Sequence, residues 1–453
     1  MTPAHAAPGE GRPPPPGFAE ALRFWLKLGF VSFGGPAGQI AIMHAELVER
    51  RRWISERRFL HALNYCMLLP GPEAQQLATY LGWLMHRTAG WLAAGLLFVL
   101  PSLLILLLLS WVYMAFGEQR WVAAAFAGVK PAVVAIVIHA AWRIGARTLH
   151  NGLLWAIAVA AFIGLFALKL PFPLIIGLAA LVGLVGARWG PAAFAASVPH
   201  SAWSGAHRAA VIDDDTPPPP HARGGRAALL RVLAVGLGLW VAAMLALAAG
   251  FGADALPTAM AAFFTQAALL TFGGAYAVLP YVYQGAVEQH GWLTGPQMIS
   301  GLALGETTPG PLIMVVAFVG FAGGWQAPFL GGDTALASGV AAACVVTFFT
   351  FLPSFVFIFA GAPLVEHTRG NLRFTAPLTA ITAAVVGVIV NLALFFAGHV
   401  FWPGGMSAAP DWVALGIASA ALLALWRGWL GPIAVIALCA LAGLARTAAG
   451  PLF

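Results

Sequence analysis

Charged residues are scarce in this chain: only 9% of its 453 residues are Asp, Glu, Lys or Arg, whereas 60% are hydrophobic. Ordinary soluble domains carry about 25% charged residues, so this composition excludes a soluble globular protein. Mean hydropathy is +0.86. Apolar stretches of about 17–27 residues, long enough to cross a hydrocarbon core, recur along the whole sequence. The sequence therefore predicts an all-α polytopic membrane protein whose first partner is the lipid bilayer.

Cysteine and catalytic motifs are scarce as well. Cys66, Cys344 and Cys439 lie in apolar stretches without paired spacing, which predicts small buried side chains rather than a disulfide or a metal site. There is no His-Glu-x-x-His motif, nucleophile elbow, phosphate loop or dinucleotide glycine fingerprint. These absences argue against an enzyme and predict no metal and no cofactor. The net charge of +7 lies in short loops, which indicates membrane topology rather than nucleic-acid binding.

The chain repeats the same motifs in its two halves, at a constant offset of 239 residues. The matched elements are SFGGP (32–36) with TFGGA (271–275), Trp53 with Trp292, Ser55 with Thr294, and Pro70-Gly71-Pro72 with Pro309-Gly310-Pro311. Later in each half, FVLPS (98–102) matches TFLPS (350–354) at a longer offset of 252. Two homologous halves of six apolar segments each are the simplest explanation.

The domain organisation follows from this repeat. Residues 1–20 are predicted to be a short disordered tail and not a cleaved signal, because they contain no apolar core. The first repeat spans 21–187, and the second spans 251–453. Between them we expect a polar, disordered cytoplasmic linker over 188–228, which contains DDDTPPPP (213–220), and one connecting helix over 229–250. Because that helix crosses once, the second half should face the opposite way, which makes the pair an inverted repeat.

The distribution of basic residues favours broken, re-entrant hairpins over simple crossings. The loop 44–59 carries five arginines and should be cytoplasmic. It stays inside only if the first two segments of each half enter and return on the same side, hinged at Phe-Gly-Gly and Pro-Gly-Pro. Only Arg120, Lys169 and Arg446 of the basic loop residues then lie outside. The matching loop 284–296 contains no Lys or Arg, as an external loop should.

The hinges are also the candidate site. Glycine and proline break helices, and non-helical backbone at membrane depth survives only beside protein or a wet cavity. Free amides and helix starts there would attract an anion. The predicted substrate-binding residues are Gly34, Gly35, Asn64, Pro70, Gly71, Pro72, Gln75, Gln76, Lys130, Gly273, Gly274, Thr307, Thr308, Pro309, Gly310 and Pro311. The alternative is that these glycines merely allow close helix packing and the prolines only kink.

Ionisable residues inside the apolar segments have two readings. Glu73 and Glu306 could carry a coupled proton or gate the site, or they could be neutralised structural groups. Lys130 could attract an anion or neutralise Glu73. His61 and His139 stand alone on apolar faces, which predicts core positions.

These motifs resemble the chromate ion transporter family, in its long two-domain form. The resemblance rests on residues 30–83, from FVSFGGPAGQ to YLGW, on their fainter copy at 271–321, and on the two Leu-Pro-Ser elements. Ala275 stands where the second motif would have proline. Membership implies a multi-pass protein of the inner (plasma) membrane that exports chromate and so gives chromate resistance. It also implies sulfate as a competitor and the proton motive force as the proposed driver.

Other functions stay open at this point. The chain could carry sulfate or another oxyanion, in either direction, and uniport driven by the membrane potential is as compatible as proton antiport. An intramembrane enzyme and a non-transporting scaffold are the remaining classes. The sequence leaves assembly into a homo-oligomer undecided.

Overall fold

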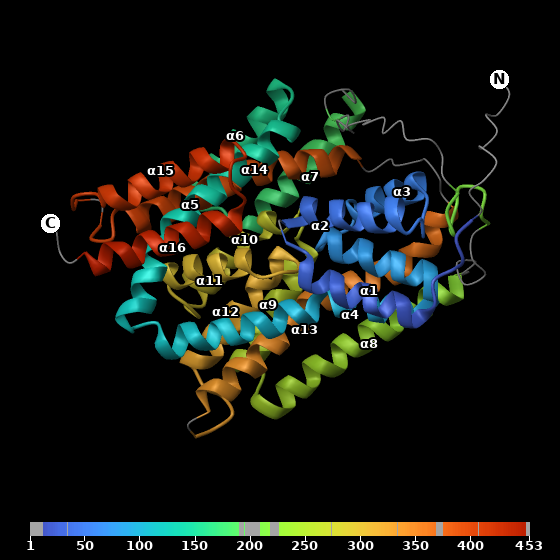
Figure 1. Cartoon of the computed structure of the whole chain (residues 1–453), viewed down its shortest axis with the longest axis horizontal. Coiled ribbons are helices and arrows are strands. Elements are labelled where there is room, and N and C mark those ends of the chain that lie inside the picture. Colours follow the sequence, from blue (N-terminus) through green and yellow to red (C-terminus); the bar gives the residue numbers. More distant parts are fainter. Residues whose placement is uncertain are drawn as a thin grey trace.

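The computed structural model describes residues 12–33, 35–189, 194, 209–217, 226–272, 274–332, 334–367, 375–405 and 407–449. These residues form a helical protein without β-strands (Figure 1). Five helices are long and apolar enough to cross a membrane: Glu73–Phe116, Arg120–Thr148, Arg226–Phe251, Ala335–Pro363 and Ala376–Phe401. Several shorter apolar helices pack among them. The prediction of an all-α polytopic membrane protein is confirmed.

The two halves use a similar order of elements, except that one bent helix of the first half corresponds to two helices of the second, which also has an additional short 3-10 helix. The first half contains α1 (Phe18–Val31), α2 (Gly35–His44), the π-helix η1 (Ala45–Arg50), α3 (Glu56–Cys66), α4 (Glu73–Phe116), α5 (Arg120–Thr148), α6 (Gly152–Phe166) and α7 (Phe172–Trp189). The single helix α8 (Arg226–Phe251) follows. The second half contains α9 (Leu256–Leu269), α10 (Ala275–Tyr283), the π-helix η4 (Gln284–Gln289), α11 (Gly295–Thr307), η5 (Leu312–Met314), α12 (Val315–Gln326), α13 (Ala335–His367), α14 (Thr375–Phe401), α15 (Trp412–Trp426) and α16 (Pro432–Ala448).

The repeat extends to local backbone detail. Both π-helices begin and end at positions 239 residues apart, Ala45–Arg50 and Gln284–Gln289. The next helix in each half is capped by an equivalent hydroxyl: Ser55 accepts from the Arg58 amide, and Thr294 accepts from the Gln297 amide. A side-chain cap satisfies one of the free amides at a helix start. The sequence-based pairing of Ser55 with Thr294 is therefore matched by equal structural roles.

All four motif segments interrupt helices. α1 stops before Ser32, α3 stops at Cys66, α9 stops at Leu269 and α11 stops at Thr307. An 11-residue helix such as α3 rises roughly 16 Å, about half of a 30 Å hydrocarbon core. We call the four interruptions the tips; they comprise residues 32–35, 67–72, 270–274 and 308–311.

Helix α4 is two antiparallel arms. His86 and Arg87 leave helical geometry, and Arg87 has a φ of 55°. The arms, 73–85 and 88–116, then pack so closely at Gly82 and Gly90 that a Cβ on Gly82 would lie 2.3 Å from the Gly90 carbonyl oxygen. The sequence placed a segment boundary between 85 and 90, and the chain reverses there.

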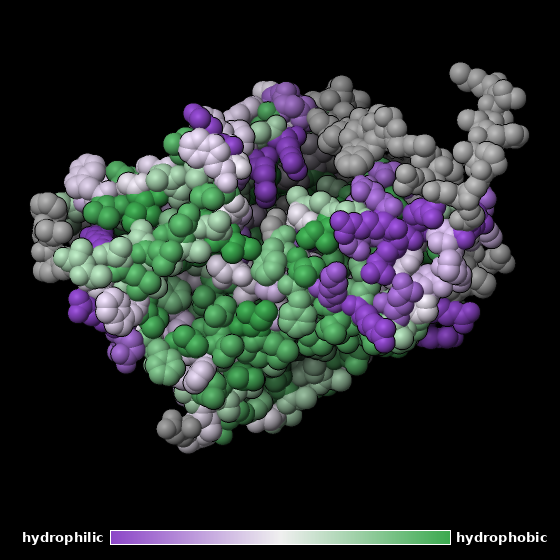
Figure 2. Space-filling model, in the orientation of Figure 1, coloured by the Kyte–Doolittle hydropathy of each residue, from purple (hydrophilic) through white to green (hydrophobic). Residues whose placement is uncertain are grey.

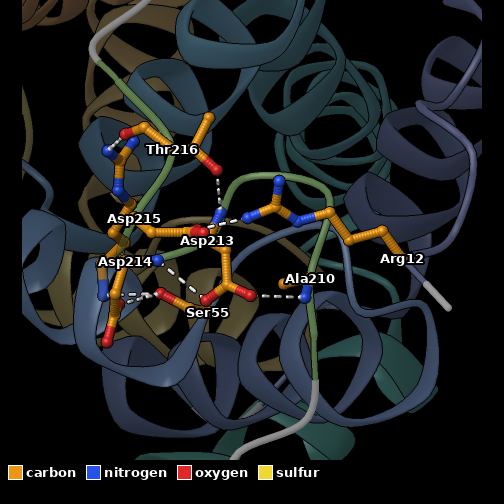
Figure 3. Close-up of polar contacts among 8 residues, drawn as sticks. Arg12, Ser55, Ala210, Asp213, Asp214, Asp215 and Thr216 are labelled. Atoms are coloured by element: carbon orange, nitrogen blue, oxygen red, sulfur yellow. Dashed lines mark hydrogen bonds and ion pairs between the residues drawn. The ribbon is translucent and has the colours of Figure 1, made fainter. Parts of the chain in front are cut away.

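Part of the linker is bound to the first half. Val211 and Ile212 donate backbone hydrogen bonds of 2.9 and 3.0 Å to the Arg52 and Trp53 carbonyls. The Ser55 hydroxyl donates to Asp214 at 2.6 Å (Figure 3). The expectation of disorder is therefore wrong for residues 209–217. Main-chain pairing and hydrogen bonds to Ser55 hold a segment whose composition alone suggests a free chain.

The loop 44–59, which contains Trp53, and the loop 284–296, which contains Trp292, lie at opposite ends of the bundle; we call them the tryptophan loops. The end with the first loop is marked by Arg51, which forms an ion pair with Glu20 near the start of α1 at 3.1 Å, while Trp53 contacts Phe24 in the middle of that helix, with ring centres 5.4 Å apart. His86, where the long arm of α4 begins, lies beside Phe18 at the start of α1. Near the far end of the arm, Tyr113 contacts Phe318 of α12 at 5.4 Å. Helix α12 ends at Gln326, whose side-chain amide donates to the Trp292 carbonyl.

The surface matches membrane embedding. Hydrophobic side chains cover much of the central and lower part of the face in Figure 2, and hydrophilic ones gather at its right end, at the upper centre and, in smaller number, at its left end. Helix α8 illustrates the apolar belt: Gly236 is its one buried residue. The end with α2 and α3 carries the exposed arginines of the loop 44–59. The opposite end carries Arg120 and Arg446, on adjoining helices joined by a hydrogen bond from Arg120 to the Thr447 carbonyl.

Candidate functional site

The four tips are joined by two reciprocal backbone hydrogen bonds. The Gly310 amide donates to the Ser32 carbonyl at 2.8 Å, and the Gly71 amide donates to the Thr271 carbonyl at 2.7 Å. Ser32 corresponds to Thr271 and Gly71 to Gly310 at the offset of 239, so the two bonds are equivalent. Each half thus supplies a backbone carbonyl that accepts a hydrogen bond from a glycine amide of the other half.

The same two glycines pack against the Leu-Pro-Ser elements of the other half. A Cβ on Gly71 would lie 2.3 Å from the Ser354 hydroxyl, and one on Gly310 would lie 2.8 Å from the Ser102 Cβ. Both glycines have positive φ, 126° and 101°, a region that residues with a Cβ avoid. Both positions therefore require glycine, because a Cβ would strain the backbone conformation and would overlap a neighbouring serine.

Five buried oxygens around the tips make no hydrogen bond with any atom in the described part of the chain. They belong to the hydroxyls of Ser32 and Ser102 and the amide groups of Gln39, Gln75 and Gln76. Their side chains are 0–1% exposed. Buried polar atoms nearly always have partners, so this cluster is suited to hold water or a polar guest. The hydroxyls are its available donors.

Several predicted residues take part in this meeting point. Pro70 accepts from the Gln76 amide at 2.7 Å, and Gln76 also reaches Ser354. Gln75 is fully buried and donates to Thr79. Gly35 and Gly274 open α2 and α10, with φ of 70° and 95°. Gly34 and Gly273 lie outside the described residues.

Other predicted residues make no hydrogen bond to another tip in the part of the chain that the structure describes. Asn64 is exposed on α3. The hydroxyls of Thr307 and Thr308 donate back to the Leu304 and Gly305 carbonyls of their own helix, at 2.9 Å each. Lys130 lies half-buried on α5. The expected role of Thr307 and Thr308 as orienting donors therefore does not fit the observed hydrogen bonds, because their protons are already used.

A pocket lies beside the tips. The empty space between its walls is about 340 Å³, a volume that includes open solvent at its mouth. Its walls come from both halves, and the lining residues are Gly35, Ile136, His139, Ala140, Arg143, Tyr276, Glu306, Leu425 and Pro432. The pocket therefore adjoins the start of α2 and contains one of the two predicted membrane carboxyls.

The two glutamates have different surroundings. The Tyr276 hydroxyl donates a hydrogen bond to the Glu306 carboxylate. Glu73 is the first residue of α4, directly after Pro72, and interacts electrostatically with the buried Cys66 thiol. Both carboxyls flank a Pro-Gly-Pro tip, Glu73 after the first and Glu306 before the second.

Sequence reasoning missed two residues of the pocket and misjudged a third. The apolar pattern of the sequence predicts a segment over about 121–142, which leaves Arg143 in a loop, but α5 continues to Thr148. Tyr276 lies three residues after Gly273, where the tip motif had drawn attention only to glycine. His139 was expected in the core, whereas it lines the pocket. A signal existed: His139 and Arg143 are four residues apart, hence on one face of a helix.

The described residues contain no group of three or more His, Cys, Asp or Glu side chains that could hold a metal. The polar groups at the tips and in the pocket are hydroxyls, amides, one guanidinium, one imidazole and the Glu306 carboxyl. The hydroxyls, the amide N–H groups and the guanidinium can donate hydrogen bonds to an anion, and the carboxyl opposes one.

Comparison with known proteins agrees with the motifs. The profile of the family described as Chromate transporter matches residues 19–184 and 258–444, which covers both halves. A chromate transport protein of Pseudomonas aeruginosa is 32% identical over 387 residues, covering 84% of this chain and 81% of that protein. A probable chromate transport protein of Synechococcus elongatus is 30% identical, covering 82% of each chain. One from Cupriavidus metallidurans is 28% identical, covering 83% of this chain and 82% of that protein. No solved structure gives a significant match.

Proposed function

The chain belongs to the chromate transporter family, and we propose that it exports chromate from the cytoplasm along the region where its four tips meet. The observation that carries this proposal is the reciprocal pair of hydrogen bonds between Ser32 and Gly310 and between Gly71 and Thr271. They bring four helix interruptions and a cluster of unpaired buried polar atoms to one place. A tetrahedral dianion crossing a membrane needs such a polar path.

The two halves act as an inverted repeat in this proposal. Support comes from the opposite positions of the Trp53 and Trp292 loops and from the equivalent π-helices. The linker segment 209–217 binds the arginine-rich loop, so both belong to the same, cytoplasmic side. Alternating access would then be a rocking of one repeat against the other about the tips.

The membrane potential favours the outward direction. An inside-negative potential of 100 mV is worth roughly 2.3 kcal/mol per charge, so a departing dianion gains about 4.6 kcal/mol. That energy could sustain a gradient on the order of a thousandfold. The membrane potential is therefore sufficient to drive export by uniport. Proton coupling through Glu73 or Glu306 is not needed to explain the outward direction.

Flux measurements in vesicles test the proposal. The full-length protein is reconstituted into liposomes loaded with chromate, and chromate efflux is followed spectroscopically under a potassium-diffusion potential of either sign. We expect efflux that requires the protein, accelerates when the chromate-containing side is negative, and is slowed by sulfate. Efflux that is indifferent to the protein would refute chromate transport. Equal or greater flux of labelled sulfate would make the chain a general oxyanion carrier.

A further inference from the structure

The pocket between α5 and α10 contains a positive group that forms no hydrogen bond in the part of the chain that the structure describes. Arg143 is half-buried on α5 and makes no hydrogen bond or ion pair with the described residues. A partly desolvated guanidinium is costly unless an anion or water meets it. His139, one turn earlier on α5, lines the same pocket, and its Nδ1 is buried without a partner.

The other walls add features that favour an anion. Gly35 opens α2, whose free amides lie at the helix start. Tyr276 lies on α10, directly after the equivalent tip of the second half. Residues at or next to the glycine motifs of both halves thus border one pocket, and α5 adds the positive charge. A guanidinium with several donors around it matches a tetrahedral oxyanion, because Arg presents a rigid fork of N–H groups.

Glu306 brings a competing negative charge into the same space. It is held by the Tyr276 hydroxyl and interacts electrostatically with Arg143. An ionised carboxyl repels a dianion from the pocket, whereas the guanidinium attracts it. The two residues therefore act on an anion in opposite directions.

We propose that this pocket is the binding site for the transported oxyanion, with Arg143 as its charged partner, His139 as a second donor and Glu306 as the opposing charge. The identity of the anion rests on the proposed function, since chromate and sulfate share size, charge and shape.

Charge-changing variants of the full-length protein test this assignment. Binding of chromate, and separately of sulfate, is measured by titration calorimetry on purified protein in nanodiscs. Arg143→Gln should weaken binding about tenfold or more, the loss expected for a hydrogen bond to a charged group, and Arg143→Lys should retain part of it. Glu306→Gln should strengthen binding. Arg147→Gln, one turn further along α5 and exposed, is the matched control and should bind like the original protein.

The opposite signs separate binding from folding. A merely structural role would weaken binding in both the Arg143→Gln and Glu306→Gln variants, and that result would overturn the proposal. Unchanged binding in Arg143→Gln would overturn it as well, while efflux by the unmodified protein left the transport function standing. If the unmodified protein bound an oxyanion through Arg143 but moved no chromate, the site would stand and the proposed function would fall.

Discussion

The amide of Gly71 donates to the carbonyl of Thr271 across 200 residues of sequence, at 2.7 Å. Its φ of 126° and the adjacent Ser354 hydroxyl leave no place for a side chain. This contact holds the first half to the second at the level of the tips.

Gly71→Ala should therefore abolish chromate efflux without preventing membrane insertion. Unfavourable backbone conformations cost about 1–3 kcal/mol, and the added methyl group must displace Ser354. Efflux from vesicles and the amount of protein in the membrane are the two measurements. Gly177→Ala is the control, because a Cβ at that helical position meets nothing within 4 Å. Undiminished efflux in Gly71→Ala would remove the tips from the transport path.

Glu73→Gln should abolish chromate resistance in cells at normal expression. The carboxyl begins α4 beside a tip, and ionisable groups at membrane depth are costly unless used. Growth in chromate and efflux from vesicles report the loss. Glu118→Gln, exposed in the turn before α5, should behave like the original chain. Full resistance with Glu73→Gln would make this carboxyl structural.

Single cysteines on the two tryptophan loops should react from opposite sides of the membrane. Arg57→Cys and Gln289→Cys are both exposed positions, introduced after replacing Cys66, Cys344 and Cys439 by alanine. A membrane-impermeant maleimide added to intact cells should label the Gln289→Cys variant. The Arg57→Cys variant should react only after the membrane is permeabilised. Labelling of both from one side would contradict the inverted arrangement.

Asp411 should stabilise the protein except in acid. Burial alone would raise the pKa of its carboxyl, but hydrogen bonds from the amides of Ala414 and Val413 and the ion pair with Arg446 lower that pKa overall. Because its pKa is lower in the folded protein, the Asp411 carboxylate stabilises the fold at pH values above the unfolded-state pKa, near 3.8. This stabilisation is lost as the pH falls through the folded-state pKa. Asp411→Ala should lower Tm by a few degrees at pH 7, and the difference should shrink below pH 3.8. Asp411→Asn keeps the helix cap but not the charge, so its Tm at pH 7 should lie between those of the original protein and of Asp411→Ala.

Local sequence rules were enough to find the interruptions but not the contacts between them. Gly71 and Gly310 are recognisable because each stands in a repeated Pro-Gly-Pro sequence that favours a helix break, whereas single prolines such as Pro101 lie inside helices. Their pairing with Thr271 and Ser32 joins residues more than 190 positions apart, and no periodicity encodes such a distance.

The charged pocket was missed for a related reason. A hydropathy boundary ended the helix one residue before Arg143, because charge resembles the end of a membrane segment whether it lies in a loop or in a cavity. The attachment of the linker segment 209–217 to the first half was not predicted either. Its Asp- and Pro-rich composition predicts a free chain, while its attachment depends on Arg52, Trp53 and Ser55 in a distant loop.

The crosswise hydrogen bonds at the tips make neither repeat self-sufficient. A half chain made alone would keep one glycine amide and one hydroxyl-residue carbonyl orphaned in the apolar interior, at several kcal/mol each. Such a fragment would need a second copy to supply the missing bonds. In the inverted arrangement proposed above, the extra helix α8 would join both copies in one chain, in equal amount and in the orientation that these bonds require.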